Sequence, residues 1–193
     1  LQLKRYEFFP VLFEADELGG LLLNANLVEN YPGFPGGISG REFIGLYRRQ
    51  IEQFRVHIEY KRVTRIEPAN PGFTLEIDGK LKQSRCLVLA TGTNPVCLPS
   101  DDVLAECRNL IHYEVVSMRN VRNRKIAIIG AGDAAFDYAL QMARWNDVVI
   151  FNRSNRINAL SHLVSRVEQH PHVQYHSNMQ LQSMERTDED TLS

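Results

Sequence analysis

The chain lacks the cysteine pattern of a disulfide-stapled or zinc-bound fold. Its 193 residues include three cysteines, Cys86, Cys97 and Cys107. An odd number at this wide spacing matches neither a disulfide framework nor a zinc site, and the sequence opens without a secretory signal pattern. We therefore expect free thiols, no metal site and a cytoplasmic protein.

The chain also lacks an excess of charge of either sign and any long apolar run. The formal net charge is -1, which gives no electrostatic reason to bind nucleic acid or an anionic membrane. No window approaches the roughly 18 apolar residues that a membrane span needs. With 44% hydrophobic and 23% charged residues, the composition is that of an ordinary globular protein.

What the chain does have is a nucleotide-binding pattern in "KIAIIGAGDAAFDYAL", residues 125–140. Four apolar residues precede a G-x-G-x-x-A turn, and a helical pattern follows it. Gly130 allows a tight turn, Gly132 lets the backbone approach a pyrophosphate, and Ala135 keeps helix and strand close. The start of the helix then faces the phosphates. The candidate contacts are Gly130, Gly132, Asp133 and Ala134.

The next strand, "DVVIF", predicts which nicotinamide cofactor is preferred. An acid at its end would favour the free 2'-hydroxyl of NADH, but the chain has Asn152 and then Arg153 there. Arg153 and Arg156 offer charge-assisted hydrogen bonds to a 2'-phosphate, each worth about 1.5–3 kcal/mol. We expect NADPH; the alternative is two solvated arginines in a loop.

The first half carries part of a second nucleotide-binding unit. The apolar run "VLF" ends at Glu14, and "ELGG" follows with Gly19 and Gly20. In such a unit the second strand ends in an acid that binds a ribose hydroxyl, about 20 residues after the glycine turn. About 20 residues before Glu14 lies upstream of Leu1, so the glycine turn of this unit would precede the printed sequence. We therefore expect a portion of a longer flavoprotein or a truncated product. A surface glutamate after a buried strand is the alternative.

Other segments predict the elements around these patterns. The loop "NYPGFPGGISG" could press against a flat ligand or simply connect elements. Residues 39–54 have capping-box spacing and helical periodicity. Alternation in "VHIEYKRVTRIEP" and "FTLEIDG" predicts strands with a hairpin turn at Asp78 and Gly79. The run "CLVLATG" predicts a buried strand of the main sheet that ends at Ala90, Thr91 and Gly92.

The segments "GGLLLNANLVENYPGFPGGISG", "CLVLATGTNPVCLP" and "KIAIIGAGDAAFDYAL", in this order, carry a family resemblance. They resemble the thioredoxin-reductase-like flavoproteins of the pyridine nucleotide-disulfide oxidoreductase superfamily. The resemblance implies an α/β fold of two Rossmann-like, three-layer nucleotide-binding domains, with a small antiparallel β excursion in the FAD domain. It implies a partial FAD-binding domain over 1–117 and a partial NAD(P)H-binding domain over 118–193, and the cofactors FAD and NADPH.

The resemblance also implies roles for single residues by motif matching. Glu14 corresponds to the FAD ribose ligand, and Thr91 and Gly92 match the family's "ATG" signature. The remaining implied contacts with FAD are Gly19 and Gly20 at the phosphate side, Asn30 and Tyr31 near the flavin, and, more loosely, Arg62 and Val63 near the adenine.

The chain departs from thioredoxin reductases in one motif. Those proteins carry a Cys-x-x-Cys just before the strand that opens the NADPH domain, and the matching stretch "LIHYEVVSMRNVRNRK" has no cysteine. With His112 and Tyr113 it is more similar to the "HY" segment of ferredoxin-NAD(P) reductases of the thioredoxin-reductase type. By default His112 is a linker histidine packed between domains.

These observations favour an FAD-dependent NAD(P)H oxidoreductase without a redox disulfide. Hydride would pass from NADPH to flavin and electrons to an unidentified acceptor, ferredoxin or a small molecule; the resemblance also implies a homodimer. No catalytic side chain is assigned, because the cofactors carry the chemistry. One alternative is a noncatalytic NAD(P)-binding regulatory module. Another is a disulfide substrate reduced through the three cysteines, which their spacing and the expected burial of Cys86 disfavour.

Overall fold

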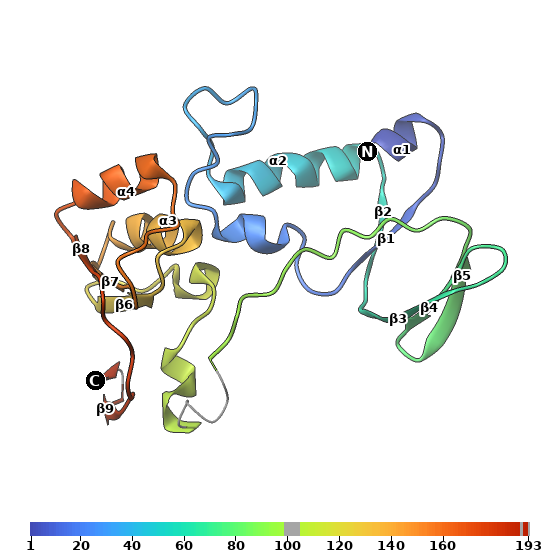
Figure 1. The fold of residues 1–193 in the computed structure, drawn as a ribbon. Helices are drawn as coiled ribbons and strands as arrows, with labels where there is room; N and C mark the ends of the chain where they lie inside the picture. Colours follow the sequence, from blue (N-terminus) through green and yellow to red (C-terminus); the bar gives the residue numbers. More distant parts are fainter. Residues whose placement is uncertain (99–104, 190, 193) are drawn as a thin grey trace. The chain divides into compact units, whose positions relative to one another are not determined.

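The computed structural model describes residues 1–98, 105–189 and 191–192 (Figure 1). The chain divides into two compact units. Unit 1 comprises residues 1–23 and 40–93, and unit 2 comprises residues 24–39 and 94–193. The predicted division into a partial FAD-binding domain over 1–117 and a partial NAD(P)H-binding domain over 118–193 stays a prediction.

Unit 1 contains a parallel strand pair and one long helix. After the short helix α1 (Gln2–Arg5), β1 (Val11–Glu14) pairs in parallel with β2 (His57–Tyr60), and α2 (Gly40–Gln53) connects them. The 3-10 helix η1 (Gly20–Asn24) begins in this unit. Phe43 and Ile44 of α2 are buried, as helical periodicity predicted. The strand ending at Glu14 and the helix starting at residue 40 are confirmed.

A small antiparallel sheet completes unit 1. It has the order β3 (Val63–Pro68), β4 (Phe73–Ile77) and β5 (Lys80–Ser84). The turn between β4 and β5 is made by Asp78 and Gly79, whose φ angles of 51° and 71° suit a two-residue hairpin. The predicted hairpin and the antiparallel excursion are therefore confirmed.

The predicted buried strand "CLVLATG" is wrong. Residues 86–92 form no strand, and Val88 and Leu89 are 77% and 66% exposed. A strand needs a hydrogen-bonding neighbour, and among the described residues β1 and β2 pair only with each other. Because this apolar run pairs with no strand, its side chains are left exposed to solvent.

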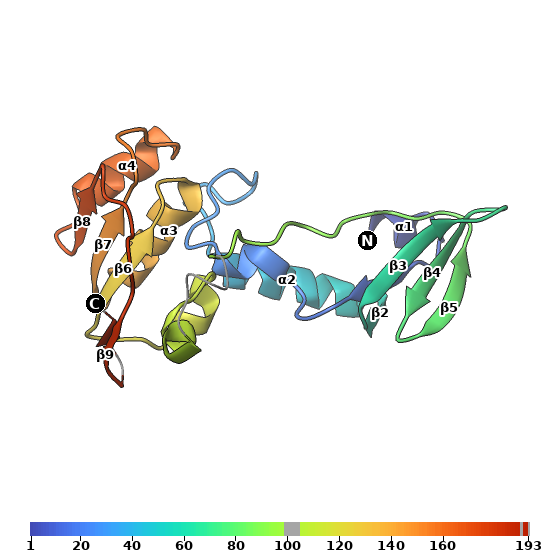
Figure 2. The same ribbon diagram turned by 60° about the horizontal axis from the view of Figure 1, so that its bottom comes forward.

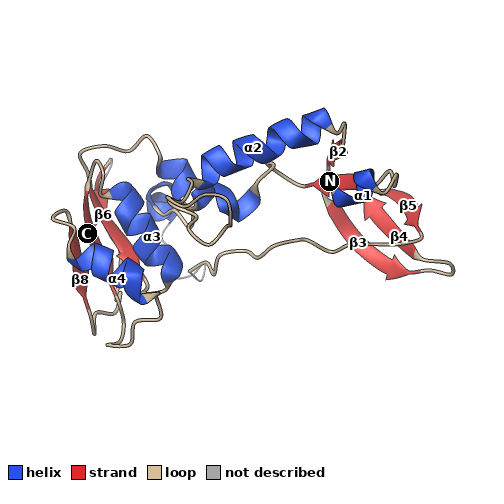
Figure 3. Ribbon diagram, turned by 90° about the horizontal axis from the view of Figure 1, so that it is seen from above, coloured by secondary structure: helices blue, strands red, loops and turns tan. Residues whose placement is uncertain are grey.

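Unit 2 contains a parallel sheet of order β6 (Lys125–Ile129), β7 (Asp147–Phe151) and β8 (Val173–His176). Helices α3 (Asp133–Met142) and α4 (Ser161–Glu168) cover one face of it (Figures 2 and 3). Short 3-10 helices η3 (Ala105–Leu110) and η4 (Val115–Met118) precede the sheet, and β9 (Arg186–Asp188) pairs with β10 (Thr191–Leu192) after it.

The core of unit 2 lies between this sheet and its helices. Val148 and Ile150 of the central strand are 1% and 0% exposed, and Phe136 of α3 is 1% exposed. Since side chains alternate along a strand, the opposite face is left more open, and Ile129 there is 55% exposed. The strand, turn and helix order predicted for residues 125–151 is confirmed, and the fold is mixed α/β. None of the described helices is both long and apolar enough to cross a bilayer.

Candidate nucleotide-binding site

The glycine turn between β6 and α3 has the geometry of a phosphate-binding turn. Gly130 has φ +129°, a conformation that a side chain rarely tolerates, and its N–H donates to the Phe151 carbonyl at 2.9 Å. Gly132 caps α3 with extended backbone. A Cβ built on either glycine meets no described heavy atom within 4 Å. Gly130 is therefore required by backbone conformation, whereas Gly132 leaves open space beside the start of a helix.

The first turn of α3 is tied to the following loop. Asp133 and Ala134 are both exposed. The Asp133 Oδ1 accepts a hydrogen bond from the Leu160 N–H at 2.7 Å, and the Asn158 N–H donates to the Ala131 carbonyl at 2.9 Å. Asp133 therefore fixes the loop that follows β7 against the turn; its predicted contact with the cofactor stays a prediction.

Asn152 organises that loop, a role that the sequence did not indicate. It is 5% exposed, and its Nδ2 donates to the Arg156 carbonyl and to the Tyr175 hydroxyl, both at 2.9 Å. Its Oδ1 accepts from the Ser154 N–H at 3.3 Å. The sequence showed only that an acid is missing at this position. The tyrosine partner lies 23 residues away, so no local pattern could have pointed to it.

Arg153 and Arg156 are displayed by this loop. Both are exposed, and in the described part of the chain neither guanidinium makes a hydrogen bond or an ion pair. Two unpaired cations next to the end of β7 fit an anionic group such as a 2'-phosphate. The contacts predicted for Arg153 and Arg156 with a 2'-phosphate stay predictions.

The predicted FAD residues of unit 1 are placed less uniformly. Glu14 ends β1, and its Oε1 accepts from the Asp16 N–H at 3.0 Å. Gly19 has φ +122°, and a Cβ there would lie 2.9 Å from the Ile44 Cγ1, so this glycine serves packing against α2. Gly20 has φ +49° and open space around it. Glu14 and Gly20 remain free to approach a ligand.

Three other residues predicted to contact FAD, Val63, Thr91 and Gly92, also belong to unit 1, and their contacts stay predictions. Val63 opens β3 opposite Ile77 and is half-buried. Thr91 and Gly92 are exposed in a segment without regular structure. A cavity of about 560 Å³ does occur in unit 1, between α2 and the loop after β1, but no predicted residue lines it. Its charged walls include Asp16, Glu17, Arg48, Glu52 and Arg55.

The segment 24–39, which carries Asn30 and Tyr31, packs against the helices of unit 2. Asp137 of α3 accepts the Asn26 N–H at 2.8 Å, and Arg144 donates to the Asn26 side-chain oxygen at 2.8 Å. Burial raises the pKa of Asp137, although the Asn26 N–H acts in the opposite direction. Asn30 and Tyr31 themselves are exposed.

A bidentate ion pair makes a second attachment of this segment. Arg166 of α4 donates to both carboxylate oxygens of Glu29 at 2.7 Å, and the His162 Nε2 lies 3.6 Å from the same carboxylate. The hydrogen bond from Arg166 lowers the pKa of Glu29. The partners lie 137 residues apart, so the sequence could not have paired them.

The residues of the predicted linker contact their neighbours. The His112 Nδ1 lies 3.1 Å from the Ser117 hydroxyl, and the Tyr113 hydroxyl accepts from the Leu98 N–H at 3.2 Å. All three cysteines are free: Cys107 is buried, while Cys86 and Cys97 are exposed. The expected burial of Cys86 is wrong, because its segment forms no strand. Among the described residues no group of His, Cys, Asp and Glu side chains could hold a metal ion.

A parallel strand, a glycine turn with a positive φ and a helix start open to a ligand define a dinucleotide-binding protein. The particular family follows from comparison. The family described as pyridine nucleotide-disulphide oxidoreductase matches residues 5–190, so the chain belongs to it. Proteins of this family use FAD and NADPH.

Relatives and solved structures agree with this membership. The chain is 25% identical to a thioredoxin reductase of Mycolicibacterium smegmatis over 94% of its length and 59% of that protein's. It is 30% identical to a ferredoxin–NADP reductase of Lactobacillus johnsonii over 82% of its length and 50% of that protein's. The crystal structure of Lactococcus lactis thioredoxin reductase (FR conformation) superposes with a TM-score of 0.86 at 25% identity, covering 98% of this chain and 62% of that one. The chain thus spans less than two thirds of these relatives.

Proposed function

We propose that the protein containing this chain is an FAD-dependent NAD(P)H oxidoreductase without a redox-active disulfide, and that it prefers NADPH. The observation that carries the proposal is the glycine turn, where Gly130 adopts φ +129° and Gly132 leaves open space at the start of α3. A flavin, when bound, would supply the redox chemistry by taking a hydride and passing electrons to an acceptor. The protein's own residues bind and orient the nucleotides.

The residues of unit 2 would bind NADPH in three places. The N–H groups of the first turn of α3 would donate to the pyrophosphate. Gly132 would let that pyrophosphate come close, because no described atom occupies the space a Cβ would take. Arg153 and Arg156 would pair with the 2'-phosphate. In unit 1, the Asp16 N–H donates to the Glu14 Oε1, so the Glu14 Oε2 would accept hydrogen bonds from the ribose hydroxyls of FAD.

The absence of a redox disulfide rests on the sequence between His112 and Lys125, which contains no cysteine. The nearest thiol before it, Cys107, is fully buried. Electrons would then leave to an external acceptor, ferredoxin or a small molecule, in the cytoplasm. The second candidate is a noncatalytic NADPH-binding module, which is favoured by the position of the glycine turn, Arg153 and Arg156 together in unit 2.

An anaerobic visible spectrum separates the two. The purified chain is incubated with FAD, excess flavin is removed, and NADPH is added once. A retained flavin band that bleaches is the result we expect of the reductase. A chain that retains no flavin but binds NADPH would show that this chain alone is not the reductase; the noncatalytic module is supported only if the whole protein also retains no flavin. Replacing Cys86, Cys97 and Cys107 by Ser should leave bleaching and electron transfer intact, and loss of transfer would restore the disulfide alternative.

A further inference from the structure

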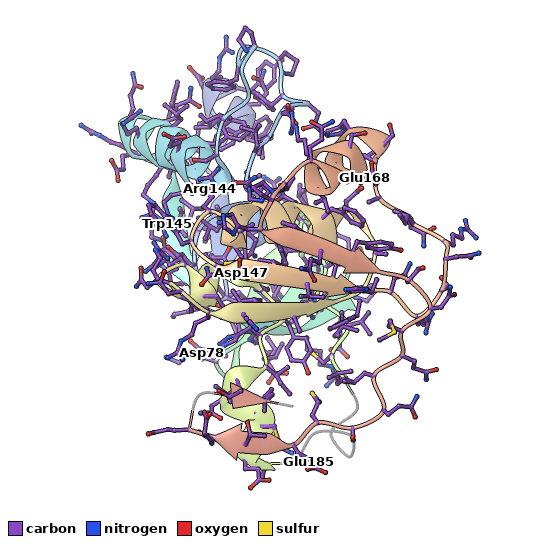
Figure 4. The ribbon with its side chains drawn as sticks, turned by 90° about the vertical axis from the view of Figure 1, so that its left-hand side faces the viewer. Asp78, Arg144, Trp145, Asp147, Glu168 and Glu185 are labelled. Carbon is purple, nitrogen blue, oxygen red and sulfur yellow. The ribbon has the colours of Figure 1, made fainter. Side chains whose placement is uncertain are left out.

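The end of β8 lies beside the loop that carries Arg153. Because β7 and β8 are parallel neighbours, both strands end at the carboxyl edge of the sheet, where open α/β sheets bind their ligands. Figure 4 shows this sheet with Asp147 at the start of β7, which is the opposite edge. The loop after β7 carries predicted contacts with NADPH, whereas residues 176–178 at the end of β8 carry none.

Backbone hydrogen bonds hold the end of β8 at one particular position of β7. The Asn152 N–H donates to the His176 carbonyl, and the Asn152 carbonyl accepts from the Met179 N–H, both at 2.9 Å. The Asn178 N–H donates to the Ser154 carbonyl at 3.4 Å. Asn178 has φ 58°, a conformation that asparagine adopts more readily than most residues. The two strand ends are therefore fixed side by side.

Asn152 is also the position at which the two nicotinamide cofactors would differ. In NAD-binding units an acid at the end of the second strand binds the ribose 2'-hydroxyl, and this chain has Asn152 there. In NADPH the same ribose position carries a phosphate group. A 2'-phosphate bound at the end of β7 would therefore have Arg153 on one side and His176 of the neighbouring strand on the other.

The His176 ring is available to an anionic group. It is exposed and stacks on the Phe151 ring, with centroids 5.9 Å apart and an interplanar angle of 26°. Within the described residues its ring nitrogens make no hydrogen bond and no ion pair. An imidazole donates through its N–H and is positively charged when protonated. A ring that is already held against a neighbour loses little further entropy when a ligand arrives.

We propose that His176 is a specificity-determining residue for the 2'-phosphate of NADPH. This inference rests on the proposed function and deepens it, because it concerns the same cofactor site. His176 would add a charge-assisted hydrogen bond from β8 to those expected from Arg153 and Arg156. Recognition would then come from two neighbouring strands. The alternative is a histidine that only covers Phe151.

The test measures binding of one end of the cofactor by calorimetry, and it needs neither flavin nor turnover. The purified protein is titrated with adenosine 2',5'-bisphosphate, which has the 2'-phosphate of NADPH, and with adenosine 5'-monophosphate, which has the free 2'-hydroxyl of NADH. The wild type should prefer the bisphosphate. His176→Ala should reduce this preference about tenfold. His176→Phe should reduce it as much, because phenylalanine keeps the stack on Phe151 but has no N–H for a phosphate.

The matched control is His172→Phe. His172 is an exposed histidine just before β8, at the opposite edge of the sheet, and its Nδ1 lies 2.9 Å from the Asp147 Oδ1. Because it lies away from Asn152, its replacement should leave the preference for the bisphosphate unchanged. Circular dichroism of each variant excludes a folding defect.

Two results would overturn the assignment of His176 alone. A preference that both His176 variants keep would make the histidine a covering residue. A preference that is lost in His176→Ala but kept in His176→Phe would assign the effect to the aromatic stack and not to the phosphate. If the wild type binds both probes equally or binds neither, the assignment fails together with the preference for NADPH. The reductase function fails separately, when NADPH does not bleach a bound flavin.

Discussion

At the scale of single residues, the two glycines of the phosphate turn have different reasons to be glycine. Gly130 has φ +129°, whereas Gly132 has an ordinary extended conformation with open space where a Cβ would stand. We expect Gly130→Ala to lower the free energy of unfolding by about 1–3 kcal/mol through backbone strain. Gly132→Ala should cost less, about 0.5–1 kcal/mol, because alanine is a poorer residue than glycine at the N-terminal cap of a helix. Urea unfolding of both variants checks this, and equal losses would contradict the assignment.

Arg153 is predicted to select NADPH over NADH. Its guanidinium is exposed without a described partner, so it loses no internal contact on substitution. Arg153→Ala should raise the KM or Kd for NADPH about tenfold and leave that for NADH nearly unchanged. If the ratio of the KM or Kd values for NADPH and NADH is the same in the variant and the wild type, Arg153 is a solvated loop arginine.

We expect the Asn152 side chain, which carries no charge, to stabilise the fold through its hydrogen bonds. Its buried amide makes three hydrogen bonds that shape the loop after β7. Asn152→Ala leaves the Arg156 carbonyl and the Tyr175 hydroxyl short of a partner, so we expect a loss of about 2 kcal/mol in thermal or urea unfolding. Tyr175→Phe removes only one of these bonds and should cost less.

At the scale of elements, the segment 24–39 is held on α3 and α4 by two carboxylates with opposite pH behaviour. The pKa of Glu29 is lowered by the hydrogen bond from Arg166, so its contribution to stability is present above the ordinary value of 4.5 and is lost as pH falls through the lowered pKa. The pKa of Asp137 is raised by burial, so the charged form costs stability and that cost fades as pH falls toward 3.8.

These signs predict opposite trends for two isosteric variants. The stability lost in Glu29→Gln should shrink between about pH 5 and pH 3, because protonation removes the wild-type ion pair as well. Over the same range the wild type should gain stability relative to Asp137→Asn. Urea unfolding of the three proteins across this pH range provides the measurement. Parallel trends in the two variants would refute the assigned attachments.

Element prediction from the sequence succeeded where local pattern and tertiary environment agree. The hairpin at Asp78 and Gly79 and the strand, turn and helix at residues 125–142 are specified by nearby residues. It failed at residues 86–92, because an apolar run reports a tendency to be buried and does not report whether a neighbouring strand is available.

At the scale of the whole molecule, the sequence predicted two nucleotide-binding halves and the family membership that comparison confirms. The attachment of residues 24–39 to α3 and α4 could not be predicted. It depends on contacts between residues that lie 111 and 137 positions apart: the Asn26 backbone N–H with the Asp137 carboxylate, and the Glu29 carboxylate with Arg166. Long-range polar contacts of this kind leave no periodic or spacing signal in one sequence.

Calorimetric binding of NADPH to the wild type, Gly132→Val and the matched control Gly45→Val tests whether the glycine turn of unit 2 binds a dinucleotide. In the structure a Cβ at either glycine meets no described atom within 4 Å, and circular dichroism of each variant checks that it folds. Gly132→Val should weaken NADPH binding about tenfold or more and Gly45→Val should keep it, because Gly132 and not Gly45 lies where the pyrophosphate would approach. Equal NADPH affinity in all three proteins would contradict it.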